Sequence, residues 1–305
     1  MQFAISIPQH VPDGTFDPAR LREYLRRAED LGFASAWTGE QVIGSMPHLG
    51  PIETMSYTAA CTERLRIGCI AFVSSLHNPL QLAKSMATLD QLSRGRLEVG
   101  LATGGRTRMF SAFGVDPSSF VGRFNEGLQL MKALWTEPRV TFEGRFWQLN
   151  GAAMEPKPFQ KPHPPIWFGA SHPNALRRAV QNAGGFFGAG SQTTAQFAEQ
   201  VKIVRQALEE QGRDAATFRI AKRVYIAIDN DAGRARQRIA AALDEQYGYF
   251  GIKGLGPVAV SGPPEECVQG LREVVDAGAE MILLNPLFDD LKQMERLAAE
   301  VMPHL

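Results

Sequence analysis

The sequence predicts an α/β fold, a (β/α)8 (TIM) barrel formed by residues 1–305 as a single domain, with a β-hairpin inserted after the fourth strand. Two observations carry this prediction. Eight short apolar runs alternate with amphipathic segments along the chain, and eight strands with eight helices is the count of such a barrel. The segment between the fourth and fifth runs is too long for a simple crossover and contains its own strand pattern.

The expected strands are apolar runs at 3–7, 34–38, 66–73, 96–102, 165–169, 185–188, 219–228 and 280–284. The expected helices show apolar residues at helical spacing and lie near 17–31, 53–63, 80–93, 121–135, 173–182, 194–211, 231–246, 264–277 and, last, 288–302.

The clearest strand-helix-strand unit lies at residues 65–105. A buried strand at 67–73 precedes Asn78 and Pro79, which are typical of a helix cap and a first helical residue. The helix ends at Gly95, which is free to adopt a positive φ, and the next strand follows at once. Two further short runs at 140–149 surround Gly144 and predict the inserted hairpin, followed by a proline-rich strap at 156–165.

Composition excludes several classes of function. Lysine plus arginine and aspartate plus glutamate number 32 each, so no basic field favours nucleic acid or an anionic membrane. No run of 18 apolar residues occurs, which favours a cytoplasmic location and no membrane span. The three cysteines are far apart and no two histidines have metal-ligand spacing, so we expect neither a disulfide nor a metal centre.

Barrel enzymes carry their active sites at the carboxyl ends of the strands, so the residues that follow each strand are the candidates. Single polar side chains in these positions are His10, Glu40, His77, Thr103 and Asn285. Two loops of small residues, 169–171 and 188–191, lead into helices, where backbone N–H groups can approach an anion. Ordinary short barrel loops are the alternative interpretation of these two segments.

Motifs around the third and fourth strands identify a family. Gly68-Cys69-Ile70-Ala71-Phe72 is followed by His77-Asn78-Pro79, then by LDQLSRGRLEVG at 89–100 and by Thr103-Gly104-Gly105. This order resembles the bacterial luciferase-like family of oxidoreductases, which depend on flavin or on the deazaflavin coenzyme F-420. The resemblance extends over nearly the whole chain and is specific for the family, whereas it says almost nothing about the substrate.

The resemblance implies a set of cofactor contacts. A strand bulge with a non-prolyl cis peptide is expected to back the cofactor ring, with the cis bond between Cys69 and Ile70. Thr103 and Gly104 are expected to contact the ring. The two small-residue loops are expected to hold the phosphate end, through Gly169, Ala170, Ser171, Gly188, Ala189, Gly190 and Ser191.

Glu40 occupies the slot where relatives carry a histidine after the second strand. A carboxylate at the rim of a partly apolar pocket can hold or pass a proton, so Glu40 is a candidate for catalysis and for a cofactor contact. The alternative is a carboxylate bonded to local backbone or to Arg106. His10 is the second catalytic candidate, and His10, His77 and Asn285 are the candidates for substrate binding.

Other positions narrow the reaction. Gly105 replaces the catalytic glutamate of the family's sugar-phosphate dehydrogenases and Gln192 replaces their lysine, which argues against a sugar phosphate. Ala102 stands at the position of the reactive cysteine of luciferases, which argues against a light-emitting function. Lys222 and Arg223, inside the seventh strand, are unusual for a barrel interior and are expected to point outward into an ion pair, with a substrate role as the alternative.

The leading functional hypothesis is hydride transfer between coenzyme F-420 and a small organic substrate. An FMN-dependent monooxygenase that receives reduced flavin from a separate reductase is the alternative, and a non-catalytic flavin-binding protein is the third. The family commonly forms homodimers through early helices, and apolar residues such as Met55, Tyr57 and Met86 lie there, so a homodimer is expected.

Overall fold

The computed structural model describes residues 1–11, 14–104, 109–248 and 251–305. It confirms the (β/α)8 barrel. Each neighbouring pair of strands in the barrel is parallel, and the sheet closes through pairing of β8 with β9. In order around the barrel the strands are β1 (Gln2–Ser6), β2 (Ser35–Thr38), β3 (Arg66–Val73), β4 (Leu97–Ala102), β7 (Ile166–Gly169), β8 (Gly185–Gly188), β9 (Arg219–Ile228) and β11 (Met281–Asn285).

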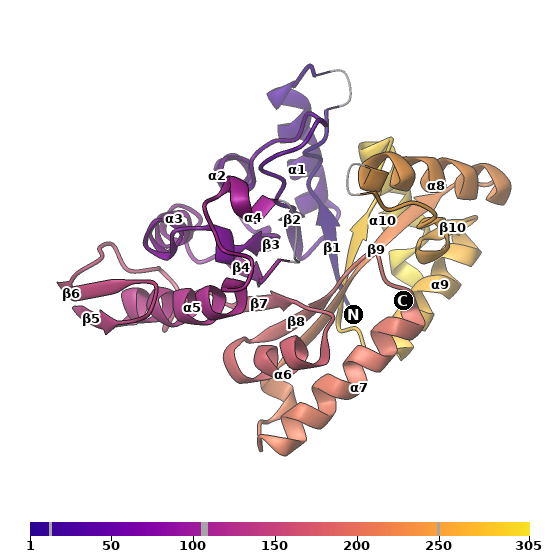
Figure 1. The fold of residues 1–305 in the computed structure, drawn as a ribbon. Coiled ribbons are helices and arrows are strands. Elements are labelled where there is room, and N and C mark those ends of the chain that lie inside the picture. Colours follow the sequence, from indigo (N-terminus) through magenta and orange to yellow (C-terminus); the bar gives the residue numbers. More distant parts are fainter. Residues whose placement is uncertain (12–13, 105–108, 249–250) are drawn as a thin grey trace.

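The helices surround the strands, as Figure 1 shows. They begin close to where the sequence predicts, and Asp17, Asn78 and His172 cap three of them through side-chain acceptors. The α-helices are α1 (Pro18–Asp30), α2 (Pro51–Cys61), α3 (Pro79–Leu92), α4 (Met109–Ala112), α5 (Phe120–Thr136), α6 (Pro173–Asn182), α7 (Thr194–Glu210), α8 (Ala232–Gly248), α9 (Pro264–Asp276) and α10 (Asp290–Glu300). Short 3-10 turns are η1 (Ser74–Leu76), η2 (Ala215–Thr217), η3 (Gly256–Val258) and η4 (Met302–His304).

The inserted hairpin is present between β4 and β7. Its strands are β5 (Val140–Glu143) and β6 (Gln148–Ala152), which pair antiparallel beside α5 (Figure 1). Glu126 of α5 accepts backbone N–H groups from three of the four turn residues, Arg145, Phe146 and Trp147. One strand was not expected from the sequence: β10 (Val260–Gly262) pairs with the last residues of β9, where β9 extends beyond the barrel.

Large aromatic rings fill the barrel interior. Trp37 and Trp167 are almost fully buried and pack edge to face, with centroids 6.0 Å apart. A Cβ on Gly68 would lie 2.4 Å from the Trp37 ring, and one on Gly185 would lie 2.5 Å from the Trp167 ring. These two glycines therefore give the rings the space that they occupy.

The larger core lies between the barrel and its helices. Met55 and Met86, two of the residues on which the homodimer expectation depends, are fully buried in this core. The homodimer remains a prediction. Within the described ranges, no helix is long and apolar enough to cross a membrane.

Candidate functional site

A bulge in β3 marks the carboxyl half of the barrel. Cys69 pairs with Val99 of β4, and the next paired residue of β3 is Phe72, so Ile70 and Ala71 leave the ladder. The structure has the non-prolyl cis peptide between Ile70 and Ala71. The predicted position, Cys69–Ile70, was wrong by one residue. Cys69 still pairs with β4 in the parallel ladder, and the irregular backbone begins after it.

The bulge is surrounded by small residues. A Cβ on Gly100 would lie 2.0 Å from the Cys69 carbonyl oxygen, so only glycine leaves room for this backbone path. A Cβ on Gly169 would lie 3.6 Å from the Cβ of Ala71 and 3.7 Å from that of Ala102. The end of β7 thus lies beside the bulge, and together these residues form a wall that we call the ring wall: Ile70, Ala71, Ala102 and Gly169.

Cys69 and Ile70 face opposite ways. Ile70 packs with the inner cluster around Trp37 and Trp167, whereas Cys69 belongs to the core between barrel and helices. Burial raises the pKa of the Cys69 thiol well above its usual range, and the Glu40 carboxylate adds to the effect. The Cys69 thiol is therefore directed away from the inner cluster, and the cofactor contact of Cys69 stays a prediction.

Glu40 is engaged with its neighbours. One carboxylate oxygen accepts the Val73 N–H at 2.7 Å, and the other lies 2.7 Å from His77 Nε2. The Glu40 side chain is only 5% exposed. The structure thus brings Glu40 together with the partly exposed His77 at the end of β3. A bond from Glu40 to local backbone was one of its two interpretations.

Thr103 and Gly104 lie next to this pair. Ser75 donates to the Thr103 carbonyl at 2.8 Å, and Gly104 has a φ of 71° with Val73 close to its Cα. The side chain of residue 104 could not be larger, since a Cβ there would lie 2.6 Å from Val73 Cγ1. Gly105 and Arg106, which figured in the sequence predictions, lie outside the described residues.

The two small-residue loops lie at the ends of adjacent strands, β7 and β8. Ser171 is exposed at the start of α6, where His172 Nδ1 accepts the Asn174 N–H at 3.2 Å. Gly190 is buried, and a Cβ on it would lie 2.7 Å from the Tyr225 ring and 3.1 Å from Arg223. The predicted members of these loops, Gly169, Ala170, Ser171, Gly188, Ala189, Gly190 and Ser191, are thus brought to one edge of the barrel.

Lys222 lies beneath the loop that follows β8. Its ammonium donates to the carbonyls of Ala189 and Gln192 at 3.1 and 2.9 Å and lies over the Phe197 ring. The residue is 2% exposed, and burial lowers the pKa of Lys222 to about 8. Lys222 points outward from the barrel, as predicted, but the predicted ion pair was wrong, because its ammonium binds two loop carbonyls instead.

Arg223 faces the barrel interior. It lies two residues from Ala221 of the inner cluster, and alternation along β9 places both on the same face. Its Nη2 donates to the Ile70 carbonyl at 2.8 Å, while its buried Nε has no partner among the described residues. The outward ion pair predicted for Arg223 was wrong, since the side chain joins the ring wall instead.

A cavity of about 360 Å³ lies at the carboxyl ends of β1, β2, β9 and β11, with α8 on one side. Its lining includes His10, Asn285 and Arg223. The structure therefore brings together His10 and Asn285, two predicted substrate contacts. Glu40 and His77 do not line it.

Unpartnered polar atoms are concentrated at this cavity. In the described part of the chain, five buried side-chain nitrogen or oxygen atoms have no hydrogen-bond partner. Four of them belong to residues that line the cavity: Gln41, His48, Arg223 and Gln246. Because an unpaired buried polar group costs about 1–3 kcal/mol, these four groups raise the free energy of the folded chain around the cavity.

His48 was not found by the sequence analysis. It lies in the loop after β2, eight residues beyond Glu40. Its backbone pairs with that of His10 in an isolated antiparallel β-bridge. Burial lowers the pKa of His48, a hydrogen bond to the Gly39 backbone opposes that shift, and the nearby His10 contributes to it. Extending the strand-end rule over the whole loop would have included His48, but no motif marks it.

Comparisons with known proteins identify the family. The model of the luciferase-like monooxygenase family matches residues 1–281. An F-420-dependent glucose-6-phosphate dehydrogenase from Intrasporangium calvum is 26% identical over 95% of this chain and 96% of its own length. The oxygenase component of a flavin-dependent trigonelline monooxygenase from Acinetobacter baylyi is 32% identical, over 52% of this chain and 45% of its own.

A solved structure agrees with this result. The monooxygenase RslO1 from Streptomyces bottropensis superposes with a TM-score of 0.86 at 25% identity and covers 100% of this chain and 99% of its own. The family model, the end-to-end match of the dehydrogenase and the shared barrel lead to one conclusion: the chain is an oxidoreductase that belongs to the luciferase-like monooxygenase family.

Proposed function

We propose that the protein transfers a hydride between the deazaflavin coenzyme F-420 and a small organic substrate. The observation that carries this proposal is that one side chain connects the ring wall with the cavity. Arg223 binds the carbonyl of Ile70 on the ring wall and also lines the 360 Å³ cavity. A cofactor ring on the wall and a substrate in the cavity would therefore be neighbours, as hydride transfer requires.

The cavity size favours a small substrate. Small-molecule sites measure about 300–1,000 Å³, and this cavity lies near the lower limit. F-420 is preferred over FMN because a dehydrogenase that matches this chain in sequence from end to end is F-420-dependent, whereas the flavin-dependent trigonelline enzyme matches about half of it.

The described residues fit a deazaflavin or a flavin. The small side chains of the ring wall leave space against the bulge, and the loop after β8 could hold a phosphate at the other end. Lys222 supports that loop from below, since its bonds draw the Ala189 and Gln192 carbonyls inward and its charge favours an anion above. When bound, the cofactor supplies the site that gives or takes the hydride, and the protein positions it.

Cofactor titration tests the proposal. Purified protein is titrated with F-420, FMN and riboflavin, and binding is followed by cofactor fluorescence. We expect the tightest binding for F-420, with reduction of bound F-420 by a substrate and no oxygen consumption. Binding of neither F-420 nor FMN would overturn the proposal.

A Lys222→Met variant examines the phosphate end. Removal of a cation near a bound phosphate costs about 1–2 kcal/mol, so we expect FMN affinity to fall roughly tenfold while riboflavin affinity is unchanged. Equal losses for both ligands would mean that Lys222 only maintains the fold. Lys202→Met, on the exposed surface of α7, is the matched control.

The alternative function is an FMN-dependent monooxygenase. The full-length structural match to RslO1 favours it, and the trigonelline relative, an oxygenase component, suggests a separate reductase as partner. Consumption of oxygen by the FMN-loaded protein, once an NADH-dependent flavin reductase is added, would select this function over the first.

A further inference from the structure

We propose that Arg123 is a positioning residue for the cofactor ring and that it makes the inserted hairpin part of the cofactor site. This inference rests on the proposed function, because it concerns the same site. It begins from three contacts that Arg123 of α5 makes at once, two with the turn of the hairpin and one with the loop after β3.

Two side chains of α5 fix the hairpin turn. Glu126 accepts N–H groups of the turn, as described above. Arg123 lies three residues earlier, with Cζ 4.8 Å from the centroid of the Trp147 ring and 5.5 Å from that of the Phe146 ring. Burial lowers the pKa of Arg123, and the Glu126 carboxylate opposes that shift. Because an aromatic ring attracts a cation more strongly when water is partly excluded, the turn and Arg123 hold each other in place.

The same guanidinium reaches the loop after β3. Arg123 Nε donates to the Ser75 carbonyl at 3.3 Å. Ser75 is fully buried, and its hydroxyl donates to the Thr103 carbonyl at 2.8 Å. Thr103 directly follows Ala102, which ends β4 and belongs to the ring wall. Arg123 and Ser75 therefore connect the hairpin turn with the edge of the ring wall.

The two kinds of contact require an arginine. Its guanidinium is planar, so one face can lie on an aromatic ring while an N–H group donates in the plane. A lysine ammonium is a compact point charge that lacks this flat face. Arg145 provides a comparison, since its Cζ lies 5.2 Å from the same Phe146 ring. It is exposed in the turn itself and, among the described residues, makes no hydrogen bond to the loop after β3.

The connection leads to the ring end of the cofactor. Ser75 and Thr103 follow β3 and β4, the strands that contain the bulge and Ala102, whereas the loops expected at the phosphate follow β7 and β8. Loss of Arg123 removes a donor from the Ser75 carbonyl and leaves this loop free to shift against the wall. The affinity for the ring should therefore fall whether or not the ligand carries a phosphate.

Paired ligands separate the two ends of the cofactor. Riboflavin has the ring without the phosphate and FMN has both, and each is titrated by fluorescence into wild type, Arg123→Met and Arg145→Met. We expect Arg123→Met to weaken both ligands equally, by about tenfold, and Arg145→Met to remain within about twofold. This is the opposite of the pattern expected for Lys222→Met, which should weaken FMN alone.

Two outcomes of these titrations would overturn the proposal. One is a riboflavin affinity of Arg123→Met within about twofold of wild type, which is the range of an ordinary surface substitution. The other is a loss confined to FMN. If wild type binds only the deazaflavin, F-420 and its phosphate-free ring alcohol replace FMN and riboflavin, with the same expectations.

A second measurement distinguishes positioning of the ring from maintenance of the fold. The visible circular dichroism of a bound flavin depends on the surroundings of its ring, and it is recorded at saturating FMN. We expect an altered spectrum for Arg123→Met and the wild-type spectrum for Arg145→Met. A wild-type spectrum for Arg123→Met, whatever its melting temperature, would mean that this residue only docks the hairpin.

A double-mutant cycle tests the route through Ser75. Ser75→Ala removes the hydroxyl that holds the Thr103 carbonyl. Because both substitutions break one connection, adding Ser75→Ala to Arg123→Met should weaken riboflavin by less than about threefold more. Losses that multiply in full would refute this route.

Arg123→Lys replaces Arg123→Met if the latter does not fold. It retains the cation but not the flat face, so its riboflavin affinity should still fall, and wild-type affinity would overturn the proposal. Absence of F-420 and FMN binding by wild type would instead refute the proposed function, so the two failures are distinguishable.

Discussion

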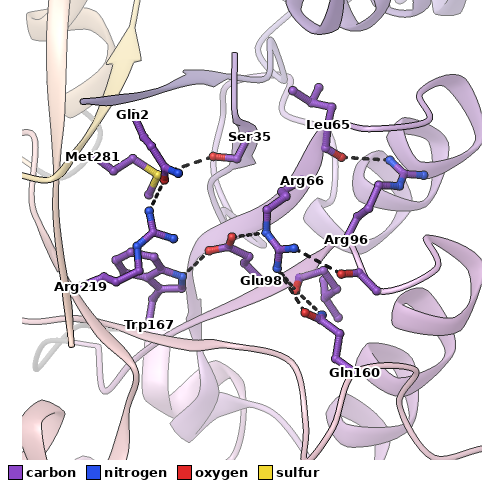
Figure 2. Close-up of polar contacts among 12 residues, drawn as sticks. Gln2, Ser35, Leu65, Arg66, Arg96, Glu98, Gln160, Trp167, Arg219 and Met281 are labelled. Carbon is purple, nitrogen blue, oxygen red and sulfur yellow. Dashed lines mark hydrogen bonds and ion pairs between the residues drawn. The ribbon is translucent and has the colours of Figure 1, made fainter. Parts of the chain in front are cut away.

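At the amino-terminal end of the barrel, the buried carboxylate of Glu98 accepts bonds from Arg66 and from the Trp167 indole, and Gln160 and Arg96 bond to the surrounding carbonyls (Figure 2). At the carboxyl end, buried atoms of Gln41, His48, Arg223 and Gln246 have no partner within the described ranges. The same sheet thus carries a complete polar network at one end and an incomplete one at the other.

This difference separates stability from function. A satisfied network lowers the free energy of the folded state, whereas unsatisfied groups raise it until a ligand binds. In barrels of this class the amino-terminal face serves stability and the carboxyl-terminal face carries the chemistry. Substitutions at the two ends should therefore have opposite signatures, which the following predictions examine.

The largest effect is expected at the amino-terminal network. Arg66→Met leaves Glu98, which is 3% exposed, without its cation, and breaking such a pair from one side costs about 3 kcal/mol in unfolding free energy. Urea denaturation measures the loss. Arg64→Met, at an exposed and distant ion pair of 4.0 Å, should change it by less than about 0.5 kcal/mol. A loss below 1 kcal/mol for Arg66→Met would contradict the comparison.

A pH effect follows from Lys222, which is buried near the other end. Its pKa of about 8 in the folded protein lies below its usual value of 10.5, so between these pH values the unfolded chain binds more protons. Stability contributed by this residue should rise with pH across that window, by about 2 kcal/mol up to pH 10. Denaturation of wild type and Lys222→Met at pH 7.5 and pH 10 isolates this rise, and equal slopes would show that the group titrates normally.

Substitution of Glu40 should lower the unfolding free energy, as substitution in the amino-terminal network does, although Glu40 lies at the carboxyl end of the barrel. Glu40→Ala removes the acceptor of the Val73 N–H and the partner of His77, and we expect a loss of about 1.5 kcal/mol in unfolding free energy. Glu40→Gln retains an acceptor and should lose less than half of that. Should Glu40→Ala leave stability unchanged while Glu40→Gln abolishes turnover, Glu40 would be the catalytic group after all.

The smallest effect is expected at Gln246. Its Oε1 is buried without a partner in the part of the chain that the structure describes, so Gln246→Leu removes an unsatisfied group. We expect the unfolding free energy to rise or to stay within about 0.5 kcal/mol. A fall of more than 1 kcal/mol in thermal or urea denaturation would show that this atom has a stabilising partner.

The sequence was sufficient for the barrel because strand and helix periods alternate strictly and because caps such as Asn78-Pro79 mark helix starts. It placed His10 and Asn285 at the cavity through the strand-end rule alone. It missed the partners of Lys222, since the carbonyls of a distant loop, here those of Ala189 and Gln192, leave no local pattern in the sequence.

The catalytic role of Glu40 stays a prediction. Its position in the sequence predicts a proton carrier, and the structure adds two hydrogen bonds that the sequence did not indicate, to the Val73 N–H and to His77. His48 stands in no motif, and only the cavity and its unpaired Nε2 distinguish it from other loop histidines. The cis bond was misplaced by one residue for a related reason, since ladder register depends on β4 as well as on β3.

Arg223 has one further consequence. Its guanidinium holds the Ile70 carbonyl with Nη2 and faces the cavity, so a single rigid group belongs to both halves of the site. Thermodynamic linkage then applies: if a ligand in the cavity changes the affinity at the wall by some factor, a ligand at the wall changes the affinity in the cavity by the same factor. The total binding free energy would be the same whether the cavity ligand or the wall ligand is added first. Arg223→Met would reduce the effect of each ligand on the affinity for the other.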